Sequence, residues 1–352
     1  MYPRLLIDLD KLAHNAKSLA EFCGSSGITV SAVTKVFCAD TKMVDTLLKQ
    51  PVSFLADSRL ENIESYPKDI KVRSMLLRLS SPSEAERVVK SCDISLNSEL
   101  STIKKLGEAA KSAGVNHSII LMVDLGDLRE GIYHTNEVLL LETAKFIQEH
   151  SNLELEGVGV NLTCYGSVLP TTENMQKLCE IAKKFDVKIV SGGNSSSLLL
   201  LKDGKMPKEI NNLRLGESVV LGLETVLGEP FMNLKQDVVT LEAEIIELMD
   251  KPSMPEGELG MNAFGEKPVY EDRGIRKRAI LSIGRQDTVC DGLTCTDPGV
   301  EVVGASSDHL IVDVTDATNR LVVGDTLTFS LSYGAILAAF TSKYVKRKYI
   351  GG

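Results

Sequence analysis

The chain has 352 residues, of which 43% are hydrophobic and 25% are charged, and its formal net charge is −9. These values are typical of a globular protein and favour one large domain plus a smaller one. No segment approaches the roughly 20 apolar residues of a membrane-spanning helix, and "MYPRLLIDLD" lacks the regions of a signal peptide. The seven cysteines are scattered, which indicates reduced thiols in the cytoplasm. Basic residues form no long cluster, so no nucleic-acid partner is expected, and "YVKRKYI" at 344–350 is interpreted as a solvated helix end.

Helix-like and strand-like segments alternate between residues 11 and 217. Amphipathic patterns predict helices at 11–23, from Ser83, and at 99–114, 136–150 and 174–185. Between them lie eight short apolar runs: "TVSAVTKV", "SFLADS", "RSMLLRLS", "ISLNSE", "HSIILMVDLG", "LEGVGVNLT", "VKIVSGG" and "NNLRLGE". Eight such units over roughly 200 residues favour a parallel (β/α)8 TIM-type barrel, although an open doubly wound sheet would also alternate.

The pattern changes after about residue 225. Runs such as "DVVTLEAEIIELM" and "DHLIVDVT" are β-rich and are separated by Gly, Pro and Asp turns. We therefore predict an α/β barrel at 11–225 and a C-terminal β domain at 226–352, with the extended N-terminal segment 1–10 pairing with the latter.

One lysine lies at the end of the first barrel run, in "SAVTKV". The ordinary behaviour of a lysine there is to extend its ammonium into solvent, since lysine is rarely buried without a partner. The alternative is a chemical role for Lys35, because an uncharged amine condenses with carbonyl compounds.

Loops after the seventh and eighth runs indicate an anion site. "SGGNSSSLLLL" places Asn194 and Ser195 directly before a helix-like segment, and "LRLGESVVLG" supplies Gly216. Each loop alone would be an ordinary turn, but phosphate sites after strands seven and eight recur in α/β barrels. Together with Lys35 they predict pyridoxal 5′-phosphate, an aldehyde with a phosphate, held by Lys35 as a Schiff base.

Several segments resemble the alanine racemase-like family of fold-type III pyridoxal-phosphate enzymes, which have an α/β barrel followed by a β domain. They are "IDLDKLAHNAK", "AVTKV", "MVDLGDLREG", "GGNSS", "LRLGE", "GASSDHLIVDV" and "GDTLTFSLSYGA". Within the family the chain is most similar to the ornithine racemase branch, through "GDLREGIY", "NLTCYGS" and "GGNSSSL".

The resemblance assigns roles to individual residues. Lys35 matches the cofactor lysine, Arg129 an arginine at the cofactor's phenolic oxygen, and Asn161 a histidine against the ring. Arg214 matches the arginine that hydrogen-bonds the pyridine nitrogen. The phosphate-binding positions match Asn194, Ser195, Gly216 and Tyr333.

Arg214 also has a chemical interpretation. A guanidinium stays protonated and can only donate, so it keeps the pyridine nitrogen unprotonated and weakens electron withdrawal into the ring. That favours a racemase, because decarboxylases of this fold have an acidic residue there. The alternative is an arginine paired with a carboxylate at a barrel rim.

Racemisation requires a proton acceptor on each face of Cα. The tyrosine that serves as the second base in alanine racemases is replaced by Arg285. "TVCDGLT" at 288–294 resembles a segment of ornithine decarboxylases, which implies Cys290 as that base and Asp291 as acceptor for a side-chain ammonium. A buried turn cysteine is the alternative for Cys290, and Asp287 and Tyr165 are lesser candidates for the base.

Other departures from the family argue against alanine as the main substrate. Met122 replaces a lysine and Ala39 a tyrosine, while Asp308 is a candidate pocket residue. His309 with a single cysteine would be too few ligands for zinc, so no metal is expected.

The sequence therefore predicts a pyridoxal-phosphate racemase for ornithine or another basic amino acid such as lysine, normally a homodimer with sites shared between subunits. The alternatives are an alanine or broad-specificity racemase, a decarboxylase of basic amino acids, a non-catalytic pyridoxal-phosphate carrier, and a metal-dependent aldolase or dehydratase relative.

Overall fold

The computed structural model describes residues 1–352, which form two compact units. One unit is Leu9–Gln236, and the other combines Met1–Asp8 with Asp237–Gly352. All seven cysteines are free thiols. None of the helices combines the length and the apolar character that crossing a lipid bilayer requires.

The first unit is a closed parallel barrel. Its strands are β2 (Thr29–Val33), β3 (Phe54–Asp57), β4 (Arg73–Leu76), β5 (Ile94–Asn97), β6 (His117–Asp124), β8 (Leu153–Gly159), β9 (Ile189–Ser191) and β10 (Asn212–Leu215). They pair in the order β5-β4-β3-β2-β10-β9-β8-β6, and β5 also pairs with β6, which closes the sheet. The eight predicted strands and the barrel are therefore confirmed, and the open-sheet alternative is wrong. A short β7 (Ile132–Tyr133) pairs with the end of β6.

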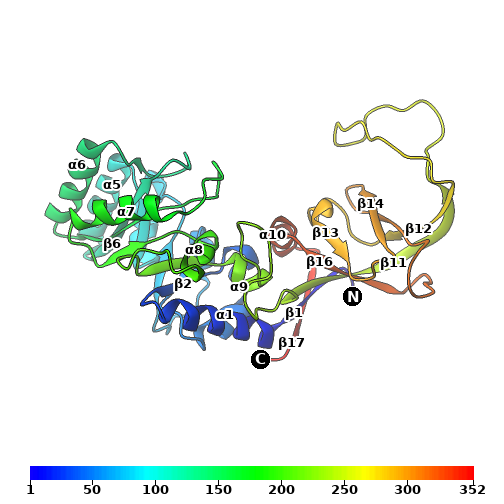
Figure 1. Cartoon of the computed structure of the whole chain (residues 1–352), viewed down its shortest axis with the longest axis horizontal. Coiled ribbons are helices and arrows are strands. Elements are labelled where there is room, and N and C mark those ends of the chain that lie inside the picture. Colours follow the sequence, from blue (N-terminus) through cyan, green and yellow to red (C-terminus); the bar gives the residue numbers. More distant parts are fainter. The chain divides into compact units, whose positions relative to one another are not determined.

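Helices connect the strands, and Figure 1 shows α5, α6 and α7 beside β6. They are α1 (Leu9–Gly24), α2 (Thr41–Leu48), α3 (Leu60–Glu64), α4 (Ala85–Ser91), α5 (Leu100–Ala113), α6 (Glu137–Glu149), α7 (Thr172–Lys183), α8 (Leu198–Lys202) and α9 (Glu217–Leu221). The helix predicted to start at Ser83 begins instead at Ala85, without a side-chain cap. The reason is that Pro82 opens a separate 3-10 turn over Pro82–Glu84.

Apolar side chains pack together inside the barrel. The cluster comprises Val33, Ala56, Met75, Ile94, Leu96, Ile120, Met122 and Ile189. Met122 is fully buried in it. The barrel strands also bury polar side chains that bond to one another, since Asn212 donates to Ser31 Oγ over 3.0 Å and accepts from Ser191 Oγ over 2.7 Å.

The second unit is a largely antiparallel sheet. Its elements are β1 (Arg4–Asp8), β11 (Val239–Pro252), β12 (Ile275–Leu281), β13 (Leu293–Cys295), β14 (Glu301–Ala305), β15 (Leu310–Asp313), β16 (Thr326–Leu331), β17 (Lys346–Ile350) and the helix α10 (Tyr333–Thr341). β1 pairs antiparallel with β11 over Arg4–Ile7, as predicted for the N-terminal segment.

The C-terminal segment differs from its prediction. The helix α10 ends at Thr341, and "KRKYI" forms β17, a parallel partner of β1, so the helix-end interpretation is wrong. The buried Val345 separates the two elements. The edge of β1 that does not pair with β11 provides hydrogen-bond partners for the backbone of β17. The lysines and arginines of the segment do not by themselves indicate this pairing.

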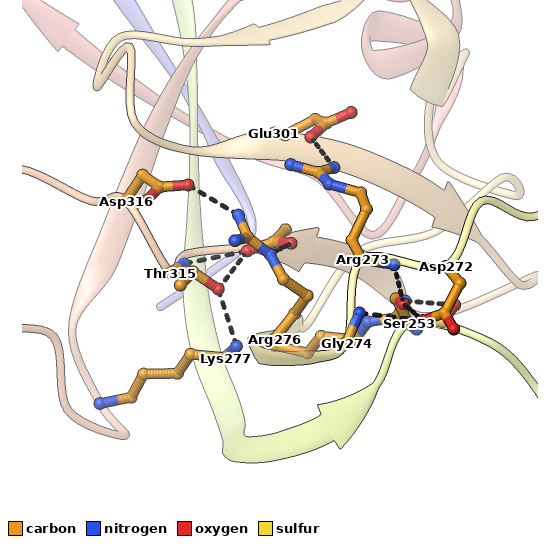
Figure 2. A network of polar contacts seen from close by, with 11 residues as sticks. Ser253, Asp272, Arg273, Gly274, Arg276, Lys277, Glu301, Thr315 and Asp316 are labelled. Carbon is orange, nitrogen blue, oxygen red and sulfur yellow. Dashed lines mark hydrogen bonds and ion pairs between the residues drawn. The ribbon is translucent and has the colours of Figure 1, made fainter.

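A long loop, residues 253–274, joins β11 and β12 (Figure 1). Figure 2 shows the polar contacts at its base, where the Arg273 N–H donates to Ser253 Oγ over 2.7 Å. Arg276 donates to Asp313 over 2.7 Å and to Asp316 over 2.6 Å. The first contact joins the two ends of the loop to each other, and those of Arg276 hold the start of β12 to the end of β15 and the turn after it.

Candidate active site

Lys35 lies directly after β2, as the first residue of a 3-10 turn over Lys35–Phe37. The preceding Thr34 is fully buried; its hydroxyl donates to Asp57 Oδ2 over 2.6 Å and lies 2.8 Å from the Tyr66 hydroxyl. These bonds fasten the end of β2 to the end of β3. Because the residue before it is fixed, the backbone of Lys35 has a defined position at the barrel mouth.

Gly216 brings the end of β10 against the end of β2. A Cβ on Gly216 would lie 2.9 Å from Cβ of Val33, so a larger residue would force the two strand ends apart. The next residue, Glu217, is half-buried. Burial raises the pKa of Glu217 above its usual value, and the positive charge of Lys35 partly opposes that rise. Glu217 therefore lies within electrostatic range of Lys35, a neighbour that the sequence analysis did not identify.

The loop after β9 lies beside the loop after β10. The Ser218 N–H donates to Ser195 Oγ over 3.3 Å, while Asn194 Oδ1 accepts from the Ser196 N–H over 2.8 Å. Gly193 has a φ of +100°, a backbone conformation that a side chain would strain. The two predicted phosphate loops are thus neighbours.

Arg214 is a buried arginine on β10, only 3% exposed. Its Nη2 donates to the Val160 carbonyl over 2.6 Å and to Asn161 Oδ1 over 2.7 Å, and its Nη1 donates to Ser191 Oγ. Burial lowers the pKa of Arg214 to about 10, so the guanidinium is still protonated at neutral pH. Its direct partners are neutral groups rather than a carboxylate, in contrast to the rim-pair alternative.

Arg129 and Asn161 meet at a residue that the sequence analysis missed, Glu130. Arg129 forms an ion pair with Glu130, and Asn161 Nδ2 donates to Glu130 Oε1. The side chain of Glu130 is only 10% exposed, whereas that of Arg129 is 42% exposed. The adjacent opposite charges of Arg129 and Glu130 are visible in the sequence and could have indicated their ion pair. The contact of Glu130 with Asn161 spans 31 residues of sequence and could not be predicted in this way.

Asp127 shapes the loop that follows Asn161. Its carboxylate accepts from the N–H groups of Cys164, Tyr165 and Val168 at 3.2, 2.9 and 3.2 Å. Burial would raise the pKa of Asp127, but these backbone donors hold it below its usual value. Tyr165, a lesser candidate for the second base, is 74% exposed. Cys164 accepts from Asn194 Nδ2 over 3.2 Å, which ties this loop to the predicted phosphate loop.

The remaining predicted residues belong to the β unit. Cys290 is 3% exposed and Asp291 is exposed, and both lie in a 3-10 turn over Cys290–Gly292. This turn contacts α10, whose first residue is Tyr333, because the Ser332 N–H donates to the Gly292 carbonyl over 2.8 Å.

Two further candidates in the β unit have side-chain hydrogen-bond partners in that unit. Asp287 is buried and accepts from Ser342 Oγ over 2.9 Å. Asp308 is exposed and accepts from Ser307 Oγ over 2.9 Å, which lowers its pKa. The Arg285 N–H donates to the Ser306 carbonyl over 2.9 Å, so the turn around Arg285 lies beside the segment that contains Asp308.

The barrel residues suit a phosphate-bearing cofactor. Ser196 Oγ is buried without a hydrogen-bond partner beside the two neighbouring loops, so a donor is available there. Buried polar groups normally have partners, and an unsatisfied hydroxyl among backbone N–H groups is chemically suited to a phosphate oxygen. An amine at the mouth and a buried guanidinium complete a donor set that fits pyridoxal 5′-phosphate.

A closed α/β barrel with a lysine after its first strand and a buried arginine on its last, together with a β unit, defines the class of fold-type III pyridoxal-phosphate enzymes. Residues 7–223 match the family described as alanine racemase, N-terminal domain, and the chain belongs to that family. It is therefore a pyridoxal 5′-phosphate-dependent amino-acid racemase, and the predicted enzyme class and cofactor are confirmed.

Named relatives match over almost their whole length. An ornithine racemase of Acetoanaerobium sticklandii is 48% identical, covering 99% of this chain and 100% of the relative. A lysine racemase of Thermotoga maritima is 39% identical, with 99% of each chain covered. An alanine racemase structure from Bartonella henselae with covalently bound pyridoxal phosphate has a TM-score of 0.76 at 20% identity, covering 99% of this chain and 100% of that one, which supports the fold.

Proposed function

We propose that this enzyme interconverts L- and D-ornithine, or acts on another basic amino acid such as lysine. The observation that carries this proposal is the 48% identity with an ornithine racemase over 99% of the chain. The exposed carboxylate of Asp291 supports it, since an acidic group is the natural partner for a side-chain ammonium. A further carboxylate, Asp308, is the second candidate for that contact.

Cofactor binding is assigned to the barrel unit, with Tyr333 of the β unit as the one exception. Lys35 would hold the cofactor, Arg129 would contact its phenolic oxygen and Asn161 would lie against its ring. Arg214 would donate to the pyridine nitrogen, which suits a guanidinium that stays protonated at neutral pH. The phosphate would be held by Asn194, Ser195, Gly216 and Tyr333.

Proton transfer is assigned to one residue of the barrel unit and one of the β unit. The bound cofactor supplies the electron sink that acidifies the substrate Cα–H. Lys35 would move the proton on one face and Cys290 on the other. Burial raises the pKa of Cys290 to about 11, so its thiol is protonated at neutral pH and is poised to deliver a proton. Asp287 and Tyr165 remain alternatives; the first is already hydrogen-bonded to Ser342 and the second is largely exposed.

Changing Cys290→Ser is expected to suppress the exchange of Cα hydrogen with D2O in one enantiomer by about 10²-fold more than in the other, because only one face loses its proton-transfer group. Proton NMR of L- and D-ornithine incubated separately with the holoenzyme measures both rates. Cys295→Ser, a buried thiol on β13, is the control and should leave both rates unchanged. Unaltered exchange in both enantiomers of the Cys290 variant would reject this assignment.

The substrate proposal is tested with Cα exchange on a panel of ornithine, lysine, alanine and serine. Ornithine should exchange fastest and lysine next, because both have a distal ammonium that an acidic residue can hold. Prompt exchange with alanine alone would overturn the substrate assignment but keep the reaction class. Release of carbon dioxide would support the decarboxylase alternative, and exchange with no amino acid would support the carrier.

We also propose a cytoplasmic homodimer in which each site uses β-unit residues of the partner chain. The free state of all seven cysteines supports a reducing compartment. The dimer rests on the family resemblance and is tested by the mass of the holoenzyme in solution.

A further inference from the structure

Glu130 lies between two arginines at the barrel mouth. Its carboxylate accepts from Nε and Nη2 of Arg129, the latter over 2.6 Å, and also from Nδ2 of Asn161. The same Asn161 side chain accepts from Nη2 of Arg214 over 2.7 Å. A continuous chain of hydrogen bonds therefore links Arg129 to Arg214 through Glu130 and Asn161.

The two ends of this chain fix the orientation of the Asn161 amide. An amide has one donor end and one acceptor end, and it can turn over when its neighbours allow it. Here a carboxylate faces the NH2 group and a guanidinium faces the carbonyl oxygen, so only one orientation satisfies both. Without Glu130 the donor end of Asn161 loses its charged acceptor, and one of the three groups that hold the Arg214 guanidinium becomes mobile.

Glu130 also sets the charge of this cluster. Burial would raise the pKa of Glu130, but hydrogen bonds and the charge of Arg129 hold it below its usual value, so the carboxylate is ionised at neutral pH. The negative charge of Glu130 offsets one of the two guanidinium charges. Because only a tenth of the Glu130 side chain is exposed, water screens this charge weakly. An anionic cofactor and its bound protons would experience that charge directly.

We propose that Glu130 is a positioning residue for the cofactor: it orients Asn161 and Arg214 and sets the local charge against Arg129. This inference rests on the proposed roles of the two arginines. It predicts that the carboxylate, and not merely the packing of the side chain, determines how the bound cofactor takes up protons.

The test compares holoenzyme with Glu130→Gln, Glu130→Asp and the control Glu142→Gln, an exposed residue of α6. The primary measurement is the pH at which the visible absorbance of bound pyridoxal phosphate changes. Removing a negative charge disfavours a bound proton, so Glu130→Gln should lower that midpoint by about 0.5 to 1 pH unit. Glu130→Asp keeps the charge, so its midpoint should lie close to that of the wild type. Glu142→Gln should match the wild type.

A second measurement uses the apoprotein, so it does not depend on the cofactor. The side-chain amide protons of Asn161 should exchange with water about tenfold faster in Glu130→Gln than in wild type, because a hydrogen bond to an ionised acceptor is lost. Wild-type amide exchange and an unshifted absorbance midpoint in Glu130→Gln would overturn the proposal. A wild-type protein that binds no pyridoxal phosphate would instead reject the cofactor assignments, and the apoprotein measurement would still decide whether Glu130 orients Asn161.

Discussion

Replacing Lys35 with arginine is expected to abolish covalent attachment of pyridoxal phosphate and to slow Cα exchange by about 10³-fold or more. The guanidinium keeps the positive charge but stays protonated, so it can neither condense with an aldehyde nor accept a proton from Cα. Thr34, which anchors the end of β2 to Asp57, is unchanged, so the barrel should fold normally. The measurements are the mass of the borohydride-reduced protein and Cα exchange by NMR.

Lys111→Arg is the matched control, since Lys111 is exposed on α5. It should label and exchange like the wild type. A Lys35→Arg protein that still carries borohydride-fixed cofactor would show that another amine is the attachment point. If circular dichroism shows that Lys35→Arg is unfolded, Lys35→Ala replaces it in the experiment. The same loss of covalent attachment and of Cα exchange is expected for Lys35→Ala.

The sequence was sufficient to predict the barrel because each strand is short, apolar and bounded by a helix-like segment. Those patterns are local, as in "TVSAVTKV" and "VKIVSGG", and the structure places β2 and β9 within them. Closure of the barrel depends on the pairing of β5 with β6, which no local pattern encodes. Closure was instead inferred indirectly, from the number of strand-like runs, which is eight, and from the positions of the two predicted phosphate loops.

Errors arose where a neighbour distant in sequence decided the structure. The "KRKYI" segment has the composition of a helix end, but the edge of β1, more than 330 residues away, turns it into a strand. Ser83 had the spacing of a helix cap, whereas Pro82 started an earlier turn.

The site residues were likewise predictable where the signal was local and missed where it depended on residues distant in sequence. Lys35, Arg214 and Gly216 were found because strand ends and glycine loops are readable in the sequence. Glu130 was missed because its importance comes from Asn161 and, beyond it, Arg214, both of which lie on later parts of the barrel. Glu217 was quoted within "LRLGE", but its proximity to Lys35 depends on the pairing of β10 with β2.

Replacing Arg214 with glutamine is expected to reduce both stability and activity. Three buried acceptors, the Val160 carbonyl, Asn161 Oδ1 and Ser191 Oγ, lose a charged donor. An unsatisfied buried acceptor costs about 1–3 kcal/mol, and glutamine can satisfy one or two of the three. One or two acceptors therefore stay unsatisfied, so the free energy of unfolding of the apoprotein should fall by about 1–6 kcal/mol, which urea denaturation measures.

The loss of activity should exceed what instability explains. A preorganised donor at a reacting centre contributes about 10²-fold or more, so Cα exchange by folded Arg214→Gln holoenzyme should fall by that factor. Arg214→Lys separates the two effects. Lysine keeps the charge and can donate to part of the acceptor set, so it should recover stability more than exchange, because it lacks the planar fork that bonds Ser191 through Nη1 and Asn161 through Nη2. If the lysine and glutamine variants both exchanged at the wild-type rate while losing stability, Arg214 would be a structural arginine of the barrel, and its permanent proton would not be what selects racemisation over decarboxylation.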